Sequence, residues 1–351
     1  MIETSSTSSG ATLTAARPVS PVPPRLGFAG VGWIGRNRLE AIAHAQAGEV
    51  AAVFDPVVEA AAGIQRTWPD VQCVGNFDEL LALPLDGIVI ATPNMLHAEQ
   101  TIAALRSGKA VFCQKPLART GRETRDVVAA ARAADRLLHV DLSYRFHTGM
   151  QRIRDLVASG RLGRIYAVEA CFHNAYGPDK PWFYDSRLSG GGCLLDLGIH
   201  LIDLALWCLD FPSVKSACGH LNCRGALVRR DSGAVEDYAA AQLSLANGAS
   251  VQLACSWRAP AGCDAQIGVT FFGTEGGASF QNVGGSFYDF RAEHFLPDRS
   301  RRLLSEPPDA WGGRAAVAWA RQLADDAGFD PQIAQLSAVA ETIDRIYGRS
   351  A

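Results

Sequence analysis

Residues 25–45, RLGFAGVGWIGRNRLEAIAHA, carry the pattern that predicts the fold of the first part of the chain. They begin as a short apolar strand, pass through Gly30, Gly32 and Gly35, and continue as a helical pattern. A Gly-x-Gly-x-x-Gly string is weak evidence alone, but a strand before it and a helix after it are the context of a dinucleotide-binding turn. A second strand, EVAAVFDP, ends at Asp55, about twenty residues after the last glycine, where this fingerprint has its acidic residue. The sequence therefore predicts a Rossmann domain.

Each glycine of the turn has its own physical task. Gly30 permits the tight turn, Gly32 lets the backbone approach a pyrophosphate, and Gly35 lets helix and strand pack closely. Trp33 and Ile34 open the helix, whose first N–H groups are free to bind the anion. A glycine turn without a ligand is the alternative interpretation.

Asp55 predicts the choice of cofactor. Its carboxylate would accept hydrogen bonds from the adenosine ribose hydroxyls and would repel a 2′-phosphate. Pro56, Val57 and Val58 follow, so no adjacent Arg or Lys is present to hold that phosphate. The sequence favours NAD over NADP.

Two further predicted strands, GIVIATP and KAVFCQKP, each end in polar residues. Parallel strands that alternate with helices bind ligands beyond their carboxyl ends. A lysine seen alone is best interpreted as a solvated loop residue, but a lysine at such a strand end is a site candidate. The side chains expected on the cofactor side are Thr92, Pro93, Asn94, His97, Gln114 and Lys115.

A third candidate feature is a polar stripe in the apolar segment GGGCLLDLGIHLIDLALW, which begins at Gly190. The spacing of Asp196, His200 and Asp203 predicts that they share one face of a helix. Their neighbours are apolar or glycine, so three ionisable groups there carry a desolvation cost that a plain core helix avoids. This favours a functional site. Polar residues satisfied at a domain junction are the alternative.

Together these motifs resemble the Gfo/Idh/MocA oxidoreductases, the glucose–fructose oxidoreductase and inositol dehydrogenase family. The resemblance runs from about Arg25 to the C-terminus and includes ATPNMLH, SGGGCLLDLGIH, GTEGG and ETIDRIYGRS. It implies that Lys115, Asp196 and His200 form the catalytic site. The family commonly has Glu before the lysine, whereas this chain has Gln114, and the neutral amide predicts altered cofactor binding.

The second half of the chain predicts a different architecture. From about residue 214 to 290, long strands alternate with a period of two, and Asn247-Gly248 is a strong hairpin signal. We expect an α/β protein with three parts: a disordered tail (1–24), a Rossmann domain with a doubly wound parallel sheet (25–147), and an α+β domain on an open, mostly antiparallel sheet (148–351). The C-terminal helix is expected to pack back toward the Rossmann domain. The resemblance implies a homodimer or homotetramer formed through the exposed face of that sheet.

Aromatic and polar residues before the glycine cluster are candidates for substrate binding. His173, Asn174 and Trp182 suit the apolar faces and hydroxyl rims of a sugar ring, although such a loop also packs domain junctions. Tyr144 and Arg145, after the last Rossmann strand, face the same junction. Arg145 would pair with a carboxylate of the substrate or with a local acidic residue.

Composition limits the possible partners. The formal net charge of −3 and the scattered arginines give no electrostatic footprint for nucleic acid. Nine cysteines without a C-x-x-C pair predict reduced thiols in a cytoplasmic protein. No metal site is predicted, and no segment reads as a membrane span.

The residues and the resemblance together predict hydride transfer between NAD and a secondary alcohol or ketone of a sugar, inositol or sugar derivative. His200 would accept the hydroxyl proton, Lys115 would stabilise oxyanion charge, and Asp196 would fix the substrate. Two alternatives are a glycoside-cleaving enzyme that uses NAD for transient oxidation and a non-catalytic NAD-binding sugar sensor.

Overall fold

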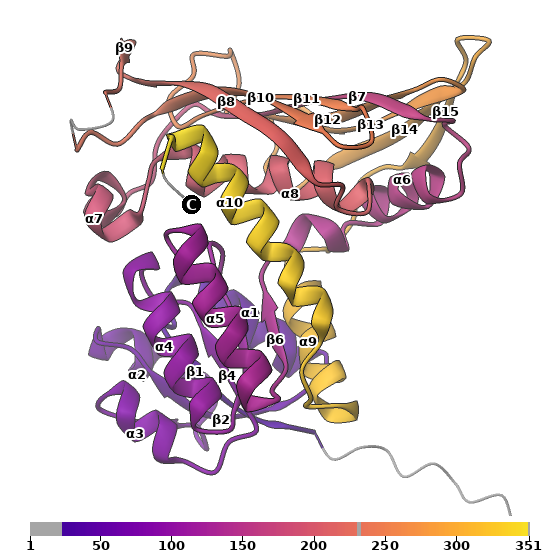
Figure 1. Ribbon diagram of the computed structural model, residues 1–351. Helices are drawn as coiled ribbons and strands as arrows, with labels where there is room; N and C mark the ends of the chain where they lie inside the picture. The colour runs from indigo at the N-terminus through magenta and orange to yellow at the C-terminus, as the bar shows by residue number, and fades with distance from the viewer. Residues whose placement is uncertain (1–22, 230–232, 350–351) are drawn as a thin grey trace, which may run out of the picture.

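The computed structural model describes residues 23–229 and 233–349. Residues 1–22, most of the expected disordered tail, lie outside the described residues. Two sheets form the molecule, one with helices on both faces and one with helices on a single face (Figure 1). This arrangement confirms the predicted fold class.

The first sheet is parallel, with strand order β3-β2-β1-β4-β5-β6. Its strands are β1 (Arg25–Ala29), β2 (Glu49–Phe54), β3 (Gln72–Cys73), β4 (Gly87–Ile90), β5 (Ala110–Cys113) and β6 (Leu138–Val140). The helices between them are α1 (Trp33–His44), α2 (Val58–Thr67), α3 (Phe77–Ala82), α4 (Asn94–Arg106) and α5 (Gly121–Ala134). The central strands are continuous apolar runs because helices bury both of their faces.

The second sheet has nine strands in the order β15-β14-β13-β12-β7-β11-β10-β8-β9, antiparallel except for the β7–β11 pair. They are β7 (Ile165–Asn174), β8 (Val214–Cys223), β9 (Ala226–Leu227), β10 (Tyr238–Leu245), β11 (Ser250–Ser256), β12 (Ala265–Gly273), β13 (Gly276–Asn282), β14 (Phe290–Phe295) and β15 (Arg301–Ser305). The helical segments that lead to and underlie this sheet are η1 (Ser143–Phe146), α6 (Thr148–Ala158), η2 (Pro181–Tyr184), α7 (Ser186–Ser189), the π-helical turn η3 (Leu194–Gly198) and α8 (Ile199–Cys208). The predicted hairpin at Asn247-Gly248 joins β10 to β11.

The segment at residues 186–208 forms the core beneath the second sheet. With a mean hydropathy of 1.5 it is long and apolar enough to cross a membrane, by length and composition only, whereas no such segment was expected from the sequence. However, 94% of its apolar window is buried inside the protein. Its hydrophobicity is therefore explained by packing against the sheet, where all ten residues of α8 are buried.

The C-terminal segment connects the two sheets. It comprises α9 (Arg314–Asp325), η4 (Pro331–Ala334) and α10 (Gln335–Tyr347). Trp319 of α9 is fully buried and packs against Phe112 of β5, with ring centroids 5.7 Å apart. Helix α10 runs from α5 to the underside of β8 (Figure 1). The core of the first domain thus includes residues far beyond the predicted boundary at 147.

Candidate active site at the carboxyl ends of the parallel strands

The glycine turn between β1 and α1 is shaped for a close ligand. Gly30 has a φ of +85°, a conformation that favours glycine. A Cβ atom on Gly35 would overlap the Gly30 carbonyl oxygen, whereas one on Gly32 would meet only open space. That open space lies at the N-terminus of α1, which fits a pyrophosphate. Trp33, at the start of the helix, is 72% exposed.

Asp55 forms the rim of this turn. One carboxylate oxygen accepts a hydrogen bond from Val31 N at 2.8 Å, and the other accepts one from Val57 N at 2.9 Å. Val57 is 56% exposed, so an apolar surface adjoins the carboxylate. The combination suits the ribose and base of a dinucleotide.

Lys115 and Asp196 meet where the two domains face each other. Lys115 Nζ, two residues beyond β5, donates to Asp196 Oδ1 at 2.5 Å and to the Asp196 carbonyl oxygen at 2.8 Å. Asp196 comes from the π-helical turn η3. Both side chains are about one-fifth exposed, so the pair is accessible from the junction.

Trp257 fixes the other oxygen of the same carboxylate. Its Nε1 donates to Asp196 Oδ2 at 2.9 Å, and the indole is 1% exposed. The sequence did not reveal this residue as part of the site. The only available signal was an indole N–H following a buried strand, which needs an acceptor.

His200 lies in the first turn of α8 and is 7% exposed. Burial and the nearby Lys115 charge hold the pKa of His200 well below its usual value. The ring is therefore neutral near pH 7 and able to accept a proton. Lys115 thus bonds to Asp196 and lies near enough to His200 for its charge to act on that ring, and these three residues form the cluster described below.

Tyr144 lies beside the cluster. Its ring packs edge-on against His200, with centroids 5.0 Å apart. Burial raises the pKa of Tyr144, and the nearby Tyr288 and Asp196 raise it further, so the hydroxyl stays protonated. Tyr288, which is 58% exposed, is a second neighbour that the sequence did not reveal.

Asp203 and Arg145 pair with each other and not with the cluster. Two of the guanidinium nitrogens of Arg145, Nε and Nη2, donate to the Asp203 carboxylate. The same guanidinium lies over the rings of Trp207 and Phe211. The local acidic partner is therefore the correct alternative for Arg145, and Asp203 is satisfied away from Lys115.

Several residues that were expected to bind the cofactor use their polar side-chain atoms for hydrogen bonds within the protein. His97 is 1% exposed, and its two ring nitrogens lie 2.7 Å from the carbonyl oxygens of Pro116 and Thr92. The imidazole thereby joins the loops that follow β5 and β4. Asn94 Nδ2 donates to the Ser189 carbonyl oxygen at 2.9 Å, across the domain junction. Pro93 is the N-cap residue of α4.

The candidate substrate residues divide between two places. Phe172 packs toward His200, and because successive strand residues point to opposite faces, His173 lies on the outer face. There it contacts Ser256 Oγ at 2.9 Å and stacks on Tyr238. The structure does not bring His173 to the cluster. Asn174, the next residue, returns to the inner face, and its Oδ1 is buried without a hydrogen-bond partner among the described residues.

Trp182 belongs to an aromatic wall that ends at Trp257. It stacks on Phe183 at a centroid distance of 3.8 Å, and Phe183 packs edge-on against Trp257. Tyr184 also packs edge-on against Trp257, at 5.4 Å. The loop before α7 is thus connected through Trp257 to the Asp196 carboxylate.

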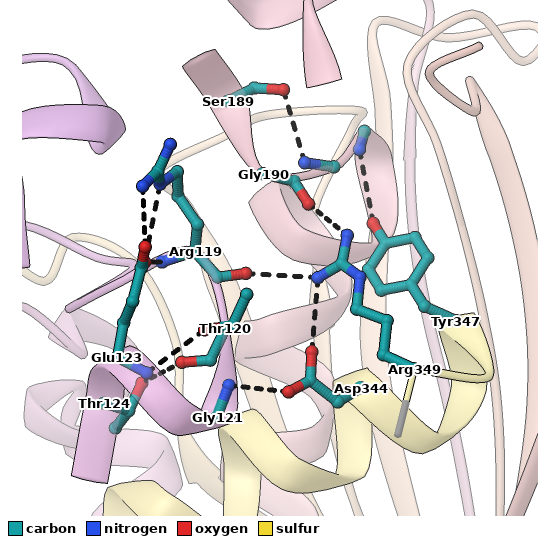
Figure 2. A network of polar contacts seen from close by, with 12 residues as sticks. Arg119, Thr120, Gly121, Glu123, Thr124, Ser189, Gly190, Asp344, Tyr347 and Arg349 are labelled. Atoms are coloured by element: carbon teal, nitrogen blue, oxygen red, sulfur yellow. Dashed lines mark hydrogen bonds and ion pairs between the residues drawn. The ribbon is translucent and has the colours of Figure 1, made fainter. Parts of the chain in front are cut away.

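The end of α10 joins the two sides of the site (Figure 2). Asp344 accepts a hydrogen bond from Gly121 N at 2.7 Å, at the start of α5. Arg349 donates to the carbonyl oxygens of Arg119 and Gly190. The segment after Lys115 and the glycine cluster before Asp196 are therefore held by the same helix end.

A buried carboxylate anchors the glycine cluster from the other side. Glu236 accepts hydrogen bonds from Gly192 N at 3.0 Å, Leu194 N at 3.0 Å and the Tyr347 hydroxyl at 2.7 Å. Burial raises the pKa of Glu236. These bonds satisfy free N–H groups at the start of the helical segment that carries Asp196.

Comparisons with known proteins agree with this architecture. Residues 25–142 match the family model of the oxidoreductase family with an NAD-binding Rossmann fold, and residues 150–279 match the GFO/IDH/MocA C-terminal domain.

Within residues 23–229 and 233–349, no group of three His, Cys, Asp or Glu side chains is arranged to hold a metal ion.

Two curated relatives and one solved structure illustrate the similarity. D-Glucoside 3-dehydrogenase of Escherichia coli K12 is 37% identical over 45% of this chain and 44% of its own length. 1,5-Anhydro-D-fructose reductase of Ensifer adhaerens is 34% identical over 56% of this chain and 60% of its own. The chain spans about half the length of these curated relatives. Levoglucosan dehydrogenase with NADH and levoglucosan has the same fold, with a TM-score of 0.79 at 22% identity over 92% of this chain and 96% of that one.

Proposed function

This chain belongs to the Gfo/Idh/MocA oxidoreductase family, and from that premise we propose that it is an NAD-dependent dehydrogenase or ketoreductase. Its substrate is a secondary alcohol or ketone of a sugar, inositol or sugar derivative. One observation carries the proposal: Lys115, Asp196 and His200 gather at the carboxyl ends of the parallel strands, next to a glycine turn that fits a dinucleotide. The names of the curated relatives support the substrate class.

The residues divide the proton chemistry among them. When bound, the nicotinamide supplies or accepts the hydride. His200 takes the hydroxyl proton, because its lowered pKa leaves the imidazole deprotonated near pH 7. The Lys115 ammonium stabilises the developing oxyanion. Asp196, held at both oxygens, orients Lys115.

The test is NADH formation with a panel of sugars, inositols and sugar acids. We expect turnover with a subset that shares one hydroxyl arrangement, with one NADH released for each ketone formed. NAD binding without turnover on any compound would favour the sensor alternative. Cleavage of a glycoside without net NADH would favour the transient-oxidation alternative.

Asp55 is expected to make NAD bind more tightly than NADP, because its carboxylate repels a 2′-phosphate. Asp55→Asn removes the charge and keeps one acceptor for the Val31 or Val57 N–H. The variant should therefore narrow the ratio of the two dissociation constants, measured by fluorescence titration. Asp70→Asn, at an exposed turn, is the matched control. Equal binding of both cofactors by the wild type would overturn the assignment.

We propose that the outer face of the second sheet is covered by another copy of the chain, as a homodimer or homotetramer. This face carries small and polar side chains such as Cys171, Gln242, Gln252 and Ala254. Light scattering should give a molar mass that is two or four times that of one chain.

A cytoplasmic location is also proposed, supported by the nine cysteines, which are all free thiols within the described residues.

A further inference from the structure

A buried carboxylate lies directly behind the cofactor side of the first sheet. Asp141 follows β6 and is 1% exposed. Two donors converge on its Oδ2: Arg38 Nε at 2.5 Å and Gln114 Nε2 at 2.5 Å. Its Oδ1 is buried and has no hydrogen-bond partner among the described residues. Arg38 thus compensates the negative charge of Asp141, and Gln114 is the second hydrogen-bond donor to this carboxylate.

This contact determines which way the Gln114 amide points. An amide has a donor end and an acceptor end, whereas an ionised carboxylate only accepts. The donor end must therefore face Asp141, which turns the Oε1 atom away from it. The hydrogen bonds of the described residues use Nε2 and leave Oε1 without a protein partner. Gln114 Oε1 is not among the fully buried side-chain atoms that lack a partner, so this oxygen is accessible at the strand end that carries Lys115.

We propose that Asp141 is a positioning residue for the cofactor site. Through Gln114 it fixes an acceptor oxygen beside Lys115, and this oxygen receives a hydrogen bond from a donor group of the bound nicotinamide nucleoside, either a ribose hydroxyl or the carboxamide NH₂. The inference rests on the proposed function, because it requires that NAD binds at this strand end. It also explains why position 114 is neutral in this chain: a glutamate there would place a second carboxylate against Asp141.

A double-mutant cycle in NADH affinity tests the inference. Gln114→Glu creates two adjacent carboxylates, and Asp141→Asn leaves the Arg38 charge uncompensated, so each should raise the NADH dissociation constant by about tenfold. The double variant again has one carboxylate and one amide beside Arg38, and its constant should return to within about threefold of the wild type.

The readout is fluorescence titration with NADH without any sugar, combined with thermal unfolding of each variant. Gln322→Glu is the matched control, because Gln322 Nε2 also donates to a carboxylate, that of Asp330 at 3.4 Å, but lies on α9. It should leave NADH affinity unchanged.

Additive effects of the two substitutions, or unchanged affinity in Gln114→Glu, would overturn the role of Asp141. If a single variant fails to fold, the test rests on the double variant, which must still fold and bind NADH for the inference to stand. If the wild type binds no NADH at all, the proposed function fails and this inference falls with it. If NADH binds with the expected coupling but no sugar turns over, only the proposed activity fails.

Discussion

Replacing His200 or Lys115 by alanine is expected to lower kcat for sugar oxidation by about 100-fold or more, because each removes a positioned proton-handling or charge-stabilising group. NADH should still bind to both variants, since neither substitution alters the glycine turn. The measurement is steady-state NADH formation together with NADH titration. His44→Ala, at the exposed end of α1, is the control and should retain full activity.

Combining the two substitutions should cost little more than the poorer single one, because groups that act as a unit show non-additive losses. Near-normal kcat in His200→Ala would show that this histidine is a packing residue.

The pH profile of the wild type gives an independent check on the role of His200. Since the pKa of His200 lies well below about 6.5, its protonation should suppress oxidation only below that pH. In the wild type, no loss attributable to His200 is expected between pH 8 and 6.5.

The glycine turn provides the second large effect. Gly32→Ala should leave thermal stability almost unchanged, because its Cβ would meet open space in the protein. NAD affinity should nevertheless fall by about 100-fold, since that space is where the backbone approaches the pyrophosphate. Calorimetric titration with NAD and thermal unfolding measure the two quantities separately.

Gly35→Ala is the contrasting variant. Its Cβ would overlap the Gly30 carbonyl oxygen, so α1 must shift and both stability and NAD affinity should fall. Full NAD affinity in Gly32→Ala would mean that the dinucleotide does not cross this turn, and the cofactor assignment would then be wrong.

The features that sequence predicted correctly depend on local pattern. The glycine turn, the alternating strands and helices, and the strand-end position of Lys115 are each encoded within one or two neighbouring elements. Asp196 lies in a π-helical turn, which the sequence did not predict. The turn nevertheless brings Asp196 into contact with Lys115.

The features that sequence missed depend on partners distant along the chain. Trp257 and Asp196 are separated by an entire strand region, and no spacing rule connects an indole to a carboxylate. Asp203 shared the periodicity of Asp196, but a tertiary contact with Arg145 determined its role. His173 was a different case, because the two-residue period of β7 already placed it opposite Phe172.

Helix α9 has a consequence for how the protein is made. Phe112 and Gly87 of the central strands lie against Trp319. The core of the first sheet is therefore complete only after residues 314–325 have been synthesised. On the ribosome, the Rossmann strands therefore emerge long before the helix that covers them. A fragment that ends near residue 147 would expose this apolar surface and be prone to aggregate. The two domains are accordingly expected to melt in a single cooperative transition, and not as separately folding units.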